Sequence, residues 1–157
     1  SKRKYQKTMK ALFLLIATRL KTISGGKWID LDKGQVDNFE TRPPIDFPGW
    51  LVRIEYVSCR DIGKGIQQCT VRITIRCVWD FHGHTDSTMK PEQLAKNLEY
   101  FDFVQNTYLA FQGYHDISVI RSPFTRIGMV EERRNDGLKV VSLTLQTEVL
   151  DQSAATN

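Results

Sequence analysis

The sequence predicts an α+β fold, with a mostly antiparallel sheet that contains a long hairpin and is packed by an N-terminal helix and a second, central helix. Apolar residues recur at helical spacing in two separate segments, and between these segments they alternate at every second position. The order is helix, strand, strand, helix and then two or three strands. An order that is rich in hairpins and keeps the helices apart is typical of α+β rather than parallel α/β proteins.

The bulk composition predicts one soluble domain over residues 1–157, because 41% of the residues are hydrophobic. The most apolar run, "ALFLLIA", is far shorter than the roughly 20 residues of a membrane span, and no signal-cleavage site follows it. The three cysteines, Cys59, Cys69 and Cys77, are an odd number, which favours a reducing compartment. One Cys59–Cys69 bridge across a hairpin remains an alternative.

The first segment is predicted to be an amphipathic helix that ends near "SGG" at 24–26. The apolar residues that recur at helical spacing in this segment are Met9, Leu12, Phe13, Ile16 and Leu20. Residues 1–27 contain eight lysine or arginine side chains and no acid, so they carry +8, whereas the remaining 14 basic and 18 acidic side chains sum to −4. We expect residues 1–8 to be a loose basic arm, and the basic segment 1–27 as a whole could neutralise nucleic-acid phosphates or form a solvated helix face and a frayed terminus.

Residues 28–49 contain three prolines and are expected to form a long ordered loop with at most one short strand. From Trp50 the apolar period changes to two, and the alternation continues through "QCTVRITIRCVWD". These two runs predict a long antiparallel hairpin with one buried and one solvent-facing side. Cys69 and Cys77 fall on the buried side as small hydrophobic residues, whereas Arg53, Arg72 and Arg76 fall on the other side.

The second helix is predicted to begin near Pro91, with Ser87 or Thr88 as its cap and Glu92 in its first turn. We expect Gly113 to end it. Its apolar stripe comprises Leu94, Leu98, Phe101, Val104, Tyr108 and Phe111.

Beyond this helix, "ISVI" and "FTRIGMVEERR" resemble strands, and "NDG" at 135–137 indicates a hairpin turn. The last predicted strand alternates Val141, Leu143, Leu145 and Val149 with polar residues. Residues 151–157 are expected to be a loose tail.

The stretch "FHGHTD" raises the question of a metal site, because His82 and His84 are two residues apart and could point the same way. A closed zinc site needs more ligands than Cys77 or Asp80 would add, so we expect an ordinary exposed loop with no metal. No nucleophile elbow or phosphate-binding glycine loop occurs in the sequence. We therefore expect no catalytic residues and no cofactor.

The chain resembles the tail terminator, or tail completion, proteins of long-tailed bacteriophages. The segments that carry the resemblance are "KALFLLIATRL", "IDFPGWLVRIEYV", "CTVRITIRCVWD", "KPEQLAKNLEYFDFVQNTYLAF" and "KVVSLTLQTEVL". The resemblance implies a non-enzymatic virion protein that is assembled in the host cytoplasm and forms a homo-hexameric ring at the head-proximal end of the tail tube. It also implies contacts with the tail tube protein and the head completion or connector protein, passage of genomic DNA through the lumen without specific binding, and no membrane.

Two charged turns, "RDIGKG" and "RRNDG", are the sequence features that best suit subunit or tube contacts. The residues expected at or near such contacts are Arg60, Asp61, Lys64, Arg133 and Arg134. The alternative function is a small basic nucleic-acid-binding module that uses the N-terminal arm or the arginines on the solvent-facing side of the hairpin.

Overall fold

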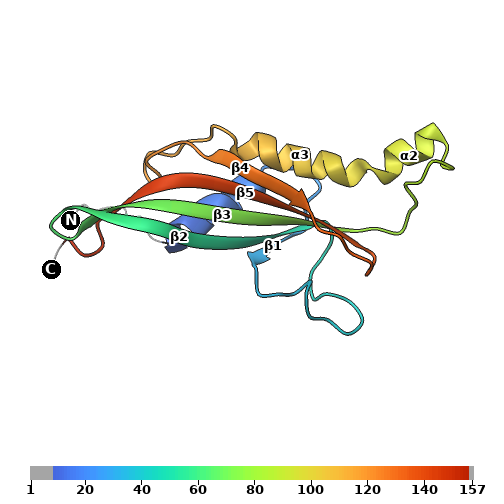
Figure 1. The fold of residues 1–157 in the computed structure, drawn as a ribbon, viewed down its shortest axis with the longest axis horizontal. Helices are drawn as coiled ribbons and strands as arrows, with labels where there is room; N and C mark the ends of the chain where they lie inside the picture. Colours follow the sequence, from blue (N-terminus) through green and yellow to red (C-terminus); the bar gives the residue numbers. More distant parts are fainter. Residues whose placement is uncertain (1–8, 156–157) are drawn as a thin grey trace.

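The computed structural model describes residues 9–155 of the chain and has an α+β fold (Figure 1). The predicted arm at residues 1–8 lies outside these described residues, as do the last two residues of the predicted tail. The elements are α1 (Met9–Leu20), β1 (Trp28–Leu31), β2 (Gly49–Gly63), β3 (Ile66–Asp80), α2 (Pro91–Asn97), α3 (Glu99–Phe111), β4 (Thr125–Glu131) and β5 (Leu138–Asp151). The strands form one sheet in the order β1-β2-β3-β5-β4, in which only the β1–β2 pair is parallel.

The predicted long hairpin is confirmed as β2 and β3, which pair from Gly49 opposite Val78 to Gly63 opposite Ile66. The predicted register is also confirmed, because the side chains expected to point inward are buried on the helix side or, for Ile54, Tyr56 and Trp79, partly buried against the same core. These buried strand residues are Trp50, Val52, Cys69, Val71, Ile73, Ile75, Cys77, Val141, Leu143, Leu145 and Val149. The strict alternation of apolar residues therefore identified the core face correctly.

Helices α1 and α3 cover this face of the sheet. Helix α1 contributes Leu12, Ile16 and Leu20 to the core, and α3 contributes Phe103, Val104 and Phe111. The Trp50 indole connects the two layers: its Nε1 donates to Thr107 Oγ1 at 3.0 Å, and its ring stacks on Phe103 with centroids 4.7 Å apart. Thr107 in turn donates to the Phe103 carbonyl at 2.9 Å, so the buried polar atoms on this side are satisfied within the core.

The second predicted helix is two helices that meet at Leu98, and its predicted contacts with the sheet are partly wrong. Helix α2 extends past the end of the sheet and buries no residue (Figure 1). Phe101, in the first turn of α3, is 42% exposed. Pro91 and Glu92 occupy the first turn as predicted, but the N-cap is Lys90 without a side-chain cap. The predicted cap Thr88 instead hydrogen-bonds Asp86, and Ser87 lies in the same exposed turn. As predicted, Gly113 follows the end of α3, with a φ of 77°.

The segment between β1 and β2 is an ordered loop, as predicted, but its location on the molecule was not predicted. It folds over one end of the outer face, the face opposite α1 and α3, and completes a second apolar cluster there. This cluster consists of Val36, Ile45, Leu51, Val78, Leu138 and Val140, with Trp28, Phe39 and Phe47 packed against it. The outer face is therefore partly covered, whereas the sequence predicted that it would be solvent-facing throughout.

The C-terminal third contains β4 and β5 as predicted, but "ISVI" is not a strand. Residues 117–119 form a turn in which the Asp116 carboxylate accepts hydrogen bonds from Ser118, and Ile120 is fully buried. Gly137 has a φ of 82° where the chain enters β5, as expected for the glycine of the "NDG" turn. After Asp151, residues 152–155 form a turn beside Gly65, where an added Cβ would lie 2.3 Å from the Ala154 carbonyl oxygen.

Candidate assembly surfaces and the Arg76 network

The two charged turns expected at assembly contacts lie at opposite ends of the sheet (Figure 1). Arg60, Asp61 and Lys64 flank the turn from β2 to β3, whereas Arg133 and Arg134 follow β4. Strand β3 starts beside the first turn and ends at Asp80, which pairs with Leu138 just after the second. The structure therefore does not bring the five residues together but places them at two separate ends.

The turn between β2 and β3 presents exposed charged side chains. Arg60, Asp61 and Lys64 are all exposed, and Asp61 accepts a hydrogen bond from Gln67 at 2.9 Å. Within residues 9–155 neither Arg60 nor Lys64 forms an ion pair. Both cations are therefore available to a partner at this end of the sheet.

At the other end, Arg133 is exposed but Arg134 is held inside the molecule. The Arg134 side chain is 11% exposed and lies 2.8 Å from Glu132 and 2.6 Å from Asp136. It also donates to the carbonyl oxygen of Val36, in the loop that covers the outer face. Arg134 thus fastens this loop to the β4–β5 connection, and its charge is already balanced by carboxylates of the same chain.

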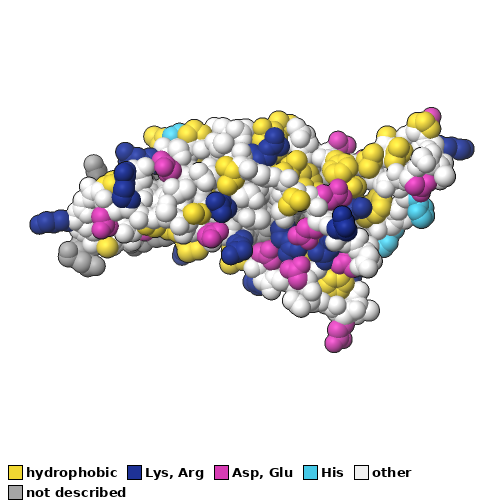
Figure 2. Space-filling view, in the orientation of Figure 1, with side chains coloured by type: hydrophobic (Ala, Val, Ile, Leu, Met, Phe, Trp, Pro, Cys, Tyr) yellow, Lys and Arg dark blue, Asp and Glu magenta, His cyan; other side chains and the backbone are white. Residues whose placement is uncertain are grey.

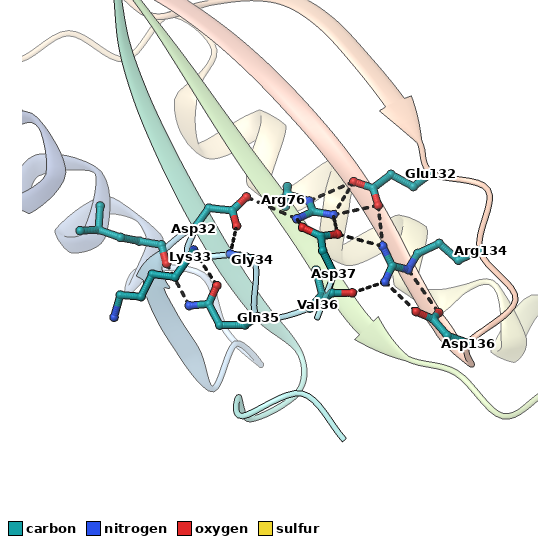
Figure 3. Close-up of polar contacts among 11 residues, drawn as sticks. Asp32, Lys33, Gly34, Gln35, Val36, Asp37, Arg76, Glu132, Arg134 and Asp136 are labelled. Carbon is teal, nitrogen blue, oxygen red and sulfur yellow. Dashed lines mark hydrogen bonds and ion pairs between the residues drawn. The ribbon is translucent and has the colours of Figure 1, made fainter. Parts of the chain in front are cut away.

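Arg76, expected on the solvent-facing side of the hairpin, is instead 8% exposed and surrounded by carboxylates (Figure 3). Its two terminal nitrogens bind the Asp37 carboxylate at 2.9 and 3.0 Å. Its Nε and Nη2 bind Glu132, both at 2.9 Å, and Asp32 lies 3.4 Å from Nη1. The prediction of a solvent-facing Arg76 was therefore wrong, because the 32–48 loop covers this end of β3.

The pKa values follow from this geometry. The hydrogen bond from Arg76 is the largest cause that lowers the pKa of Asp37, and the hydrogen bond from Arg134 does the same for Asp136. Burial alone would lower the pKa of Arg76, but its bonds to Asp37 and the charge of Glu132 outweigh burial and raise it. The lowered pKa values of Asp37 and Asp136 and the raised pKa of Arg76 favour the charged forms, and these charge-assisted bonds tie the 32–48 loop, β3 and the β4–β5 connection together.

Sequence reasoning missed this network, although the loop carried a signal of it. Residues 28–49 combine acids with apolar side chains, including Val36, Phe39, Ile45 and Phe47, which a solvated loop would not need. Figure 2 shows acidic and basic side chains gathered where this loop meets the sheet. A loop of such composition is expected to lie on an apolar face that also presents cations.

The loop from β3 to α2 carries His82 and His84, both exposed as predicted. The His82 ring lies 3.1 Å from the Asp80 carboxylate, and the His84 carbonyl accepts a hydrogen bond from Asn97 at 2.6 Å. Within the described residues, no group of three or more histidine, cysteine, aspartate or glutamate side chains could hold a metal ion.

The arginines that a nucleic-acid-binding module could use differ in how exposed they are and in whether they already have partners. Arg53 is exposed and Arg72 is half-buried on the uncovered part of the outer face, whereas Arg76 is bound by acids. In the basic N-terminal segment, Arg19 stacks on the Tyr114 ring at 4.1 Å and donates to the Ala110 carbonyl at 2.8 Å. Two of the cations that this alternative could use therefore already have partners within the chain.

None of the helices within residues 9–155 is both long and apolar enough to span a membrane. No protein-family model matches the chain, and no curated protein matches it at a significant level.

Proposed function

We propose that the chain is a non-enzymatic virion assembly protein, a tail terminator that forms a homo-hexameric ring at the head-proximal end of a phage tail tube. The observation that carries this proposal is an elongated sheet (Figure 1) whose two ends differ in their charged side chains, with Arg60 and Lys64 at one end and the paired Arg134 at the other. The resemblance noted above supports it, because the long hairpin, the helix packed on the sheet and the closing strands all occur in the order that this family implies.

A ring that stops a tube and receives a head needs two ends that bind different partners. At one end of the sheet, Arg60 and Lys64 are exposed cations without an ion pair inside the described chain. At the other end, Arg133 is exposed but its neighbour Arg134 is neutralised by Glu132 and Asp136, and α2 projects past the sheet (Figure 1). This asymmetry gives the tube protein and the head connector chemically distinct surfaces, while DNA passes through the lumen without specific contacts.

The test combines the mass of the protein in solution with capping of purified tail tubes. We expect wild-type protein to form a ring, either alone or on tubes, and to stop tube growth. The double variant Arg60→Glu/Lys64→Glu should stay folded but cap tubes less well, with the larger defect at low salt where charges are least screened. The matched control, Lys10→Glu/Lys21→Glu, makes the same charge change at exposed positions of α1 and just after it and should cap normally.

Two results would contradict the proposal at different levels. Unchanged capping by the Arg60→Glu/Lys64→Glu variant would remove this turn from the interface. Wild-type protein that stays monomeric even when mixed with tubes would overturn the tail-terminator function itself.

The alternative, a small basic nucleic-acid-binding module, is favoured by one observation. Arg53 and Arg72 share the uncovered face with Thr70 and Thr74, as in a surface that could contact a single strand. Fluorescence anisotropy with single-stranded DNA tests this function. Binding that weakens steeply with salt and is lost in Arg53→Gln/Arg72→Gln, by a protein that does not cap tubes, would favour the alternative.

A further inference from the structure

The sheet has two edges that are open within the described residues. Strand β4 forms one edge, and three of its seven residues, Ile127, Met129 and Val130, are 46, 47 and 63% exposed. The other edge belongs to β2, because β1 pairs only with its first four residues, Gly49 to Val52. Open edges with apolar side chains are normally protected by charge, by a cover or by another strand.

The backbone groups that point out of each edge can be assigned from single hydrogen bonds. On the β2 side, Asp32 N donates to Val52 O at 2.9 Å, so the groups of Val52 point away from β3. Because this direction alternates along a strand, the N–H and C=O groups of Ile54 and Tyr56 point out as well. On the β4 side, Glu132 N donates to Val140 O at 2.8 Å and so faces β5. The alternate residues Met129 and Glu131 therefore present their backbone groups outward.

The side chains of these four residues also lie on one face of the sheet. Met129 and Glu131 pair with Leu143 and Val141, which face the helices. Ile54 and Tyr56 pack against the same helix-side core. Strand pairing places directly opposite residues on the same face, so the two edges match in this respect.

The strand directions match too. Each of the pairs β2–β3, β3–β5 and β4–β5 is antiparallel, so β4 runs opposite to β2. Rotation about a ring axis parallel to the strands preserves their directions. Strand β4 of one copy would therefore meet β2 of the next copy as an antiparallel partner, which is a head-to-tail contact of the kind that closes into rings.

One register uses the outward groups of all four residues. It places Met129 opposite Tyr56 and Glu131 opposite Ile54. A shift of two residues in one direction would bring Glu131 to Val52, which β1 already pairs, and a shift in the other would cross the bulge between Tyr56 and Ser58. No net charge opposes the contact, since Arg53 and Glu55 balance on one edge and Arg126 and Glu131 on the other.

We propose that the subunits of the ring are joined by this edge pairing, in which β4 of each copy binds β2 of the next and the sheets become continuous. The inference rests on the proposed function, which supplies the ring, and it identifies the partner of both edges as a second copy of the same chain. Met129 then packs beside the Tyr56 ring, a favourable contact between sulfur and an aromatic ring.

The first test removes one backbone donor. Met129→Pro deletes an N–H group that points out of the sheet, so the fold should survive while the ring is lost. The matched control, Met129→Ala, shortens the side chain but keeps the N–H, and it should still form rings. Circular dichroism and thermal melting report the fold, and light scattering with electron microscopy of tubes reports the ring. Rings of normal mass in folded Met129→Pro would overturn the edge pairing.

The second test does not depend on how well the proline variant folds. In the proposed register Glu55 and Val130 are directly opposite in a non-hydrogen-bonded pair, with Cα atoms about 4.5 Å apart and within disulfide reach. We expect Glu55→Cys/Val130→Cys, in a Cys59→Ser background, to give a ladder of up to six covalently linked chains after mild oxidation. The control Arg53→Cys/Val130→Cys is offset by two residues, roughly 7–8 Å, and should cross-link poorly.

The outcomes separate the two proposals. A ring in wild-type protein without preferential 55–130 cross-linking, or with equal cross-linking in both cysteine pairs, overturns the edge pairing and leaves the tail-terminator function standing. A wild-type chain that forms no ring in solution or on tubes overturns the proposed function and the edge pairing with it.

Discussion

Arg72 and Arg76 lie four residues apart on the same strand and the same face of the sheet, yet their environments differ. Arg76 is 8% exposed and bound by three carboxylates, whereas Arg72 is half-buried, lies opposite Glu55 and has a buried Nε without a partner in the described structure. The difference arises because the 32–48 loop covers only the end of the face that contains Arg76. Alternation along a strand thus assigns a residue to a face, but the cover on that face depends on distant segments.

The largest loss of stability should come from a charged substitution on the helix-covered face, compared with a substitution at the neighbouring residue on the outer face. Ile73 is fully buried on the helix side, next to Arg72 in sequence but pointing the opposite way. Ile73→Asp would bury an unpaired charge and should cost about 4 kcal/mol or more, enough to unfold the domain. Arg72→Gln, the matched change on the outer face, should alter stability by less than about 1 kcal/mol. Urea denaturation followed by circular dichroism measures both, and equal losses would show that the strand register is wrong.

The next effect tests the contrast between the two arginines directly. Arg76→Ala would leave Asp32 without an ion-pair partner in the described structure and would leave Asp37 and Glu132 with Arg134 alone, so we expect a loss of about 3 kcal/mol. Arg72→Ala removes no ion pair found in the described structure, so its cost should stay below about 1 kcal/mol. Limited proteolysis gives a second readout, because the released 32–48 loop should be cleaved faster in Arg76→Ala alone. Similar unfolding energies and cleavage rates in the two variants would contradict the conclusion that the 32–48 loop covers Arg76 but not Arg72.

The helix-covered face could be predicted from the sequence because its signal is local. Trp50, Ile73 and Leu143 lie in uninterrupted two-residue patterns, and each is buried where the pattern places it. The cover on the outer face could not be predicted from the sequence, because the second apolar cluster brings Val36 of the loop into contact with Val78 and Val140 of the strands. These residues are far apart in sequence, and no periodic pattern links them.

The second helix shows the same limit. Leu94, Leu98 and Phe101 follow a helical stripe, but the sheet ends before α2, so the stripe predicts amphipathic character without predicting what lies opposite. For the candidate site, the two charged turns were located from their composition. The ion pairs of Arg134 with Glu132 and Asp136 could not be predicted from composition, because they depend on the conformation of the turn and on contact with a loop almost a hundred residues away.

The smallest effect is the pH dependence of the Arg76 network. The hydrogen bond from Arg76 holds the pKa of Asp37 below its ordinary value of 3.8, so Asp37 stabilises the fold fully above that value. This contribution is lost as the pH falls through the lower pKa of the folded state. It should amount to less than about 1 kcal/mol, because the Asp37 side chain is 46% exposed and partly screened.

Arg76→Met separates this contribution from the acid response of other carboxylates such as Asp86 and Asp116, whose pKa values are lowered by Thr88 and Ser118 in both proteins. In Arg76→Met, Asp37 keeps only Arg134, whose Nη1 lies 3.6 Å away, so its pKa should be lowered less and acid should remove a smaller stabilising contribution. Between about pH 5 and pH 3, wild-type unfolding energy should therefore fall more steeply than that of Arg76→Met. Urea titrations at each pH measure the two slopes, and parallel curves would mean that Asp37 and Arg76 are not coupled in the folded protein.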